Sequence, residues 1–317
     1  MRPLVTGDAT MVSEEIRLFF ALAGLLFLGL AFHGKMKKKA IIATIGWISI
    51  STYFFLDTPH YIEISDPVLI LMSAGALPAG IGIGIWELNN EKKSIEEPAL
   101  DWLKGAIFWS ALPYLAISWV PYFSVALVWV TAVQAVFFLR IAGISQLQVG
   151  APHVEYADGT TGLFSDFTGN PWLYLEPLGE GGFYIPILTS DGGPTGVSII
   201  LACSALQSMI VFVGALVALK TSPWKMRLRG LFITVPVIHL LNVFRNAGII
   251  YLDMTYRDWN WLGMGMFDFA HSYAAKAGSL IAMFLLAIVL FEILPELHNN
   301  ILKLMEPWMP KKRSNAS

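Results

Sequence analysis

Apolar runs long enough to cross a membrane recur along this chain and restrict what it can fold into. The runs occupy residues 16–32, 40–56, 67–86, 197–219, 230–252 and 266–294. A helix of about 20 apolar residues spans a hydrocarbon core of about 30 Å. Only 14% of the 317 residues are charged, whereas about 25% is usual in soluble domains. The sequence therefore predicts an all-α polytopic membrane protein forming a single integral membrane domain.

A further apolar stretch, residues 104–140, is interrupted at Val120 and Pro121. Proline ends or kinks helices because it lacks a backbone N–H and its ring clashes with the preceding turn. The stretch could form two spans, or one span together with a re-entrant or interfacial helix. We expect a bundle of seven or eight membrane helices, with seven full crossings and one incomplete helix as the favoured arrangement.

Lysine and arginine collect in alternate loops, which indicates the orientation. The loop HGKMKKK holds four lysines, residues 220–229 hold four basic residues and no acidic one, and the C-terminal tail contains PKKR. Residues 144–196 instead contain six acidic residues and no lysine or arginine. Basic loops stay in the cytoplasm. The rule predicts N-terminal helices at 16–142, an extracytoplasmic cap at 143–196, a second group of helices at 197–294 and a cytoplasmic tail at 295–317.

The predicted cap contains aromatic residues among its glycine, aspartate and proline, including Phe164, Trp172, Tyr174 and Tyr184. Connections of this length without regular structure are usually functional or disordered. Because apolar residues are interleaved throughout, we expect this segment to fold over the helices.

Three polar side chains occur at a similar predicted depth in three successive apolar runs. Counted from the outer ends, Cys203 is about six residues down, Arg245 about seven and His271 about five, or roughly 8–10 Å at 1.5 Å per residue. An arginine inside a span costs at least about 2.5 kcal/mol. We therefore predict that these residues form one site near the extracytoplasmic surface.

Each of the three also has a structural interpretation. A lone buried cysteine often behaves as a small hydrophobic residue, an arginine can extend toward the head groups, and an intramembrane histidine can be hydrogen-bonded within the bundle. Their coincidence at one depth favours a site.

The three residue types suit nucleophilic chemistry. A thiolate is the reactive form of cysteine, so Cys203 could attack a carbonyl carbon. Arg245, which keeps its proton, could stabilise the thiolate or the resulting oxyanion. His271 could accept the thiol proton and return it to a leaving amine.

Four neighbouring polar residues are candidates for supporting roles. Asp268 could orient the His271 ring from three residues away, or cap that helix, and Asn242 could hold the guanidinium of Arg245. Gln207 lies four residues after Cys203 on the expected helix, and Ser204 follows the cysteine directly.

The motif ACSALQS at residues 202–208 resembles the cysteine motif of the exosortase/archaeosortase family. In that family an arginine in the outer part of the next span and a histidine in the one after follow the motif, as Arg245 and His271 do. The resemblance covers residues 196–294 and is greatest to the archaeosortase A type. It implies Cys203 as nucleophile, Arg245 as essential arginine and His271 as third member.

The chain departs from the family pattern at two positions. Ala205 stands where the family often has glycine, which leaves the local backbone geometry open. Some archaeal relatives have arginine at the third position, where this chain has His271. Lys276 is the nearest substitute cation.

The resemblance implies a membrane transpeptidase. From the sequence itself we expect no cofactor, no metal and no nucleic-acid partner, since no basic tract beyond short loop clusters occurs. The substrates of such a transpeptidase would be surface proteins with a C-terminal Pro-Gly-Phe-type motif, a transmembrane helix and a basic tail. The cysteine would cut near the motif and hold the protein as a thioester, and a lipid amine would then release it as a lipid-anchored product.

Two other functions remain open. Arg245 and His271 could bind an anion or relay protons in a transporter or channel, although residues 210–219 and most of 280–294 are apolar. His239 and His271 could bind haem, although His239 is expected nearer the middle of the membrane. The single cysteine excludes an internal disulfide, and neither G-x-S-x-G nor H-E-x-x-H occurs.

Overall fold

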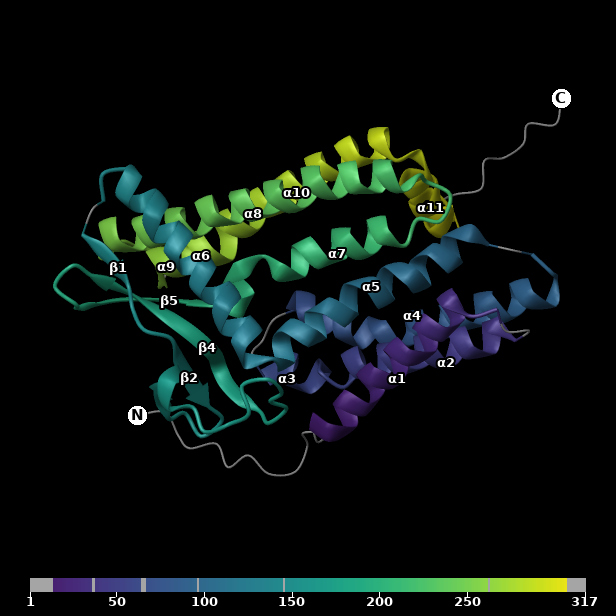
Figure 1. Cartoon of the computed structure of the whole chain (residues 1–317), viewed down its shortest axis with the longest axis horizontal. Coiled ribbons are helices and arrows are strands. Elements are labelled where there is room, and N and C mark those ends of the chain that lie inside the picture. Colours follow the sequence, from purple (N-terminus) through teal and green to yellow (C-terminus); the bar gives the residue numbers. More distant parts are fainter. Residues whose placement is uncertain are drawn as a thin grey trace. The chain divides into compact units, whose positions relative to one another are not determined.

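The structure, a computed structural model, describes residues 14–35, 38–63, 67–95, 97–144, 146–261 and 263–306 (Figure 1). The chain divides into two compact units, one formed by Met1–Trp109 with Asn299–Ser317 and the other by Ser110–His298. Each unit is described by itself. The basic PKKR sequence of the tail lies outside the described residues, as do Met36 and Lys37 of the lysine-rich loop.

The described part of the first unit is helical. Its helices are α1(Glu14–His33), α2(Lys39–Phe55), α3(Thr58–Glu63), α4(Pro67–Lys92) and the first half of α5(Pro98–Trp119). Gly80 and Gly84 let α4 approach α2 closely, because a Cβ atom at either glycine would collide with Ser51 or Thr44. Small residues commonly serve this purpose in membrane helix pairs. Trp47 and Leu28 are buried beside this contact.

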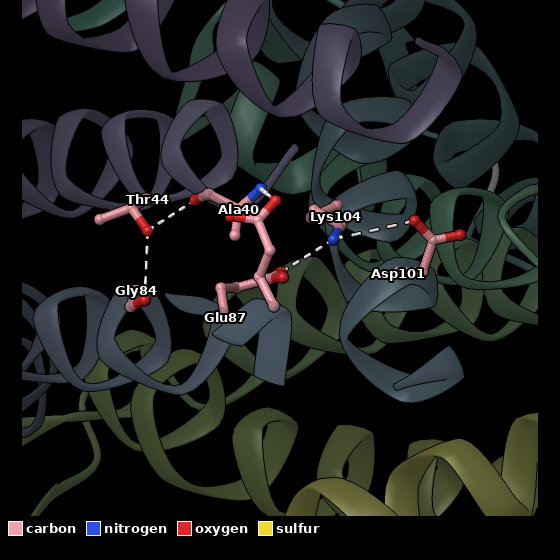
Figure 2. Close-up of polar contacts among 7 residues, drawn as sticks. Ala40, Thr44, Gly84, Glu87, Asp101 and Lys104 are labelled. Atoms are coloured by element: carbon pink, nitrogen blue, oxygen red, sulfur yellow. Dashed lines mark hydrogen bonds and ion pairs between the residues drawn. The ribbon is translucent and has the colours of Figure 1, made fainter. Parts of the chain in front are cut away.

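Polar contacts hold the ends of α2, α4 and α5 together (Figure 2). The ammonium of Lys104 lies 2.8 Å from Glu87 Oε1 and 3.8 Å from Asp101 Oδ1. Lys104 is 5% exposed and Glu87 8%, so each charge is compensated in a place where an unpaired charge would be strongly destabilising. Glu91 accepts a hydrogen bond from the backbone N–H of Ala40 at the start of α2.

The second unit combines helices with a β-sheet. Its helical elements are the second half of α5, α6(Pro121–Ile141), α7(Leu206–Val217), α8(Trp224–Thr255), the short α9(Met266–Asp268), the π-helical turn η3(Phe269–Ala274) and α10(Ala275–Ile293). The first turn of α11(Pro295–Met305) follows, and the residues of α11 from Asn299 onward belong to the first unit. In Figure 1, α8 and α10 run alongside each other, and the two helices are in contact.

The five-stranded sheet lies within the segment predicted as a cap. Its strands are β1(Leu147–Val149), β2(His153–Tyr156), β3(Thr161–Leu163), β4(Leu178–Thr189) and β5(Pro194–Ile200). The order is β1-β4-β2-β3, β5 also pairs with β4, and every pairing is antiparallel. A second, two-stranded sheet joins β6(Asn260–Trp261) to β7(Met264–Gly265). The expectation of an all-α chain did not include these strands.

The larger sheet packs on α6 and α8. Val128 and Val136 of α6, Ile185 and Ile187 of β4, and Ile250 of α8 belong to one buried cluster. Lipid-exposed sheet edges do not occur within the hydrocarbon of a bilayer, because their backbone groups would lack hydrogen-bond partners. The sheet must therefore lie outside the hydrocarbon or be covered by protein.

Six described segments are helical, long and apolar enough to cross a membrane by length and composition. They are Glu15–His33, Lys39–Glu63, Pro67–Lys92, Pro121–Ile141, Trp224–Thr255 and Met266–Ile293. The predicted multi-pass helical architecture is confirmed, and the count is close to the expected seven or eight. The stretch 104–140 contains two helices separated at Val120.

The prediction of one helical span over residues 197–219 is wrong. Residues 197–200 belong to β5, in which buried and exposed residues alternate as pairing with β4 requires. The helix begins only at Leu206, and its 12 residues extend about 18 Å, too short to cross a bilayer. The predicted depth of Cys203 within a continuous helix is therefore also wrong.

Candidate active site

Cys203 lies in the turn between β5 and α7. Residues Leu201–Ser204 form a 3-10 turn, η2, and the next residue, Ala205, has a left-handed conformation with φ of +57°. The backbone reverses at this residue, so α7 starts three residues after the cysteine. The thiol is free and half-buried.

Two asparagines of α8 hold the backbone of this turn. The amide nitrogens of Asn242 and Asn246 donate to the carbonyl oxygen of Cys203 at 2.7 and 2.8 Å. Both asparagines are buried, at 7% and 3% exposure. Asn242 was expected to hold Arg245, but no hydrogen bond joins the two side chains within the described residues.

Asn246 was not identified from the sequence. A signal was nevertheless present, because two asparagines four residues apart on a membrane helix share a face and polar residues within spans are rare.

Ser204 and Leu206 complete the turn. The Ser204 hydroxyl is fully buried, donates to the carbonyl of Leu201 at 2.6 Å and accepts from the backbone N–H of Leu206 at 3.2 Å. The supporting role of Ser204 is thus to close the turn, and its hydroxyl has both hydrogen bonds within the protein.

A cavity of about 890 Å³ lies beside this turn. Ala202 and Ala205 line it on either side of Cys203, and Arg245 lines it from α8. Ala270 and Ala274, which lie in the π-helical turn that carries His271, line it as well. The cavity therefore lies among the three elements that carry the predicted site residues; Arg245 is itself part of the described lining, whereas Cys203 and His271 are not.

Most of the cavity lining is apolar, and its polar residues come from three helices. Gln207 and Ser208 lie on α7, Asn242 and Arg245 on α8, and Lys276 on α10. No carboxylate residue is part of the described lining. A cavity with cationic groups and apolar walls suits a ligand that has both an apolar portion and an atom that becomes negatively charged.

Among the described residues, the guanidinium of Arg245 has no hydrogen-bond or ion-pair partner. Arg245 is half-buried. A charged group placed within a membrane helix without a partner is usually functional. The guanidinium of Arg245 is therefore available to a ligand in the cavity.

His271 lies in η3, where the helix widens into a π-helical turn. Such turns are frequent at functional sites. The ring stacks on Phe267, with centroids 5.5 Å apart and planes 4° from parallel. The charges of Arg245, Lys276 and Asp268 act on it electrostatically. Among the described residues, no hydrogen bond joins the side chains of Cys203, Arg245 and His271.

The remaining predicted residues have different surroundings. Asp268 is exposed, and neither a hydrogen bond to His271 nor a side-chain cap is found for it in the described chain. Gln207 donates to the hydroxyl of Tyr114 at 3.4 Å, and His239 is hydrogen-bonded to Gln134 at 2.7 Å.

Comparison with known families identifies the group to which this chain is related. Residues 15–291 match the family model described as Transmembrane exosortase (Exosortase_EpsH). The chain belongs to the transmembrane exosortase family. This match covers most of each unit and all three predicted site residues of this exosortase-family protein.

One curated relative of the exosortase-family chain is Archaeosortase A of Haloferax volcanii. The two are 24% identical over 210 residues, which amounts to 66% of this chain and 61% of the relative. The alignment thus covers less than two thirds of the relative's length. No solved structure matches the chain.

Proposed function

We propose that this protein is a membrane-embedded cysteine transpeptidase of the archaeosortase type, with Cys203 as its nucleophile. The observation that carries the proposal is the cavity, which borders the turn of Cys203, the turn of His271 and an arginine without a partner in the described protein. Membership of the exosortase family supports the same reaction class.

The thiolate of Cys203 attacks the carbonyl carbon of the scissile peptide bond and forms a tetrahedral intermediate. Its negatively charged oxygen is stabilised by the guanidinium of Arg245, which needs no rearrangement to release another partner. His271, having taken the proton of the Cys203 thiol, gives it to the departing amine, and the intermediate collapses to a thioester on Cys203. An acceptor amine then attacks the thioester and restores the thiol.

The proposed substrates are surface proteins with a C-terminal sorting signal composed of a Pro-Gly-Phe-type motif, a transmembrane helix and a basic tail. The acceptor is the amine of a membrane lipid, so the product is anchored to the membrane through its new C-terminus. The largely apolar lining of the cavity is compatible with both partners. The reaction takes place at the extracytoplasmic side.

The test is mass spectrometry of the mature C-terminus of a substrate protein, produced in cells with the wild-type protein or with Cys203→Ala. We expect a shortened, lipid-modified C-terminus with the wild type and an intact signal with the variant. Ser198→Ala, which changes an exposed residue of β5 outside the described cavity lining, is the matched control and retains processing. Normal maturation with Cys203→Ala would overturn the proposal.

Arg245→Lys tests whether the reaction needs the directed N–H donors of arginine or only a positive charge. Arginine presents several N–H donors in a planar arrangement, whereas lysine presents a flexible point charge. We expect Arg245→Lys to lose at least about 100-fold in rate, comparable with removal of an oxyanion donor, while the membrane abundance is unchanged. Equal rates for the two proteins would mean that a positive charge alone is sufficient.

A further inference from the structure

A short loop of the sheet region, residues 171–175, has an unusually apolar surface. Its sequence is PWLYL, and Trp172, Leu173 and Leu175 are 62%, 52% and 47% exposed. The loop contains no charged residue. Three large exposed apolar side chains within four residues form a contiguous patch, and such patches usually contact another apolar phase or molecule.

Backbone hydrogen bonds hold this loop on the junction between α5 and α6. The N–H of Tyr122 donates to the carbonyl of Pro171 at 3.2 Å, and the N–H of Tyr174 donates to the carbonyl of Trp119 at 2.9 Å. The N–H of Trp172 donates to Asn170 Oδ1 at 2.9 Å. The loop is therefore fixed to the point where one helix ends and the next begins.

Aromatic contacts continue the apolar surface from the loop onto α6. The Trp172 ring packs edge-to-face on Tyr122, with centroids 5.0 Å apart, and on Phe123, at 6.4 Å. Tyr122 and Phe123 occupy the first turn of α6 and are themselves 44% and 49% exposed. The patch on the loop is thus continuous with the outer surface of a membrane-spanning helix.

The junction of α5 and α6 has a defined level relative to a bilayer. The two helices contain 22 and 21 residues, so each is about 32 Å long, close to the thickness of the hydrocarbon core. Whichever of them crosses the membrane, its end at Trp119–Tyr122 lies near the boundary between hydrocarbon and head groups. Tryptophan and tyrosine are enriched at this level, because their rings are apolar and carry one polar group.

We propose that residues 171–175, together with Tyr122 and Phe123, insert into the interfacial layer of the leaflet beside the sheet. The occupant of this surface is lipid, and the insertion fixes the sheet, and the turn of Cys203 that follows β5, at a constant height above the hydrocarbon. The turn between β2 and β3 carries the exposed Ala157 and Asp158 instead, and it remains in water.

The test measures the depth of single labels in the full-length protein. In a Cys203→Ser background, which has no other cysteine, Leu173→Cys and Ala157→Cys are each labelled with the fluorophore NBD and reconstituted in phosphatidylcholine vesicles. The vesicles contain lipids with spin labels near the head group, and aqueous iodide is added separately. Both introduced cysteines replace exposed side chains, so neither removes a buried contact.

We expect the label at position 173 to be quenched by the spin-labelled lipid at least about twofold more than the label at 157, as interfacial insertion requires. Iodide should show the opposite order. Equal quenching of the two labels by lipid would overturn the proposal. Protection of position 173 from both quenchers would also overturn it, because a protein surface would then cover the loop. Neither result depends on catalysis, since the background has no thiol nucleophile.

Discussion

The backbone of the Cys203 turn depends on a conformation that alanine rarely adopts. A left-handed residue other than glycine costs about 1–2 kcal/mol, yet Ala205 has φ of +57°. This explains why the family motif often has glycine at this position, and it answers the question that the sequence left open. The turn must be held by other contacts, of which the two asparagines on the Cys203 carbonyl are the most direct.

The asparagine pair gives a prediction about the reactivity of Cys203. Removing one donor leaves the other on the same carbonyl, whereas removing both leaves a buried acceptor unsatisfied at about 1–3 kcal/mol. We expect Asn242→Ala or Asn246→Ala to slow processing about threefold to tenfold, and the double variant to lose more than the product of the two. The measurement is the processing rate alongside the rate of Cys203 alkylation in detergent.

Asn300→Ala is the matched control, because Asn300 is also buried, at 6% exposure, but lies on α11. It should change thermal stability while leaving alkylation of Cys203 unchanged. If the double variant alkylates at the wild-type rate and retains full processing, the asparagines do not position the nucleophile. If Asn246→Gln processes substrate at the wild-type rate while Asn246→Ala does not, an amide donor at this position is sufficient.

At the scale of elements, the connection between α7 and α8 is organised by one carboxylate. Glu296 at the start of α11 accepts hydrogen bonds from the backbone N–H groups of Lys220, Thr221 and Ser222, at 3.1, 3.1 and 2.5 Å. Burial raises the pKa of Glu296, but the hydrogen bonds from Ser222 and Thr221 outweigh it and leave the pKa below the ordinary value of 4.5. The ionised form is therefore favoured by the fold.

This lowered pKa predicts an acid-dependent loss of stability. A carboxyl whose pKa is lower in the folded state contributes stability above its unfolded pKa, and the contribution is lost as the pH falls through the folded value. We expect the melting temperature of the wild type to fall below about pH 4.5, and the difference from Glu296→Gln to shrink over the same interval. A difference between the two proteins that stays constant from pH 7 to about pH 3 would contradict this assignment.

The elements that the sequence predicted best are those with long apolar runs. The first two runs correspond to α1 and α2 within two residues, and the third corresponds to α4, which continues to Lys92. Long apolar segments are predictable because a single segment can cross a membrane only as a helix, in which its backbone groups are hydrogen-bonded to one another. The run at 197–219 was misassigned, since a buried strand and a buried helix are both simply apolar. The π-helical turn at His271 has no sequence signal of its own, so a prediction from α-helical spacing did not include it.

The sequence was sufficient to select the residues of the candidate site but not to predict how they are arranged in space. Cys203, Arg245 and His271 were selected as polar residues in apolar surroundings, and their three elements do border one cavity. The reason given for their proximity, equal depth in three continuous helices, fails for Cys203, which lies in a turn between a strand and a short helix. Pairing between β4 and β5 brings this turn to α8 and α6, and such long-range pairing leaves no local pattern.

At the scale of the whole molecule, the charge pattern and the sheet lead to one prediction about orientation. The loop at residues 220–229 carries four basic residues, whereas the sheet segment carries only acidic ones. The positive-inside rule then places the α7–α8 connection in the cytoplasm and the sheet outside. In the Cys203→Ser background, Ala157→Cys should react with a membrane-impermeant maleimide in intact cells, and Lys225→Cys only after permeabilisation.

Both positions are exposed, at the β2–β3 turn and in the first turn of α8, so the difference between them measures the side of the membrane rather than burial. A cysteine on the outside of intact cells should be labelled to at least about ten times the extent of one on the inside, because the bilayer excludes the charged reagent. Labelling of Lys225→Cys without permeabilisation, with protection of Ala157→Cys, would reverse the orientation. The turn of Cys203, joined directly to β5, would then open toward the cytoplasm, and proteins already at the cell surface could not be its substrates.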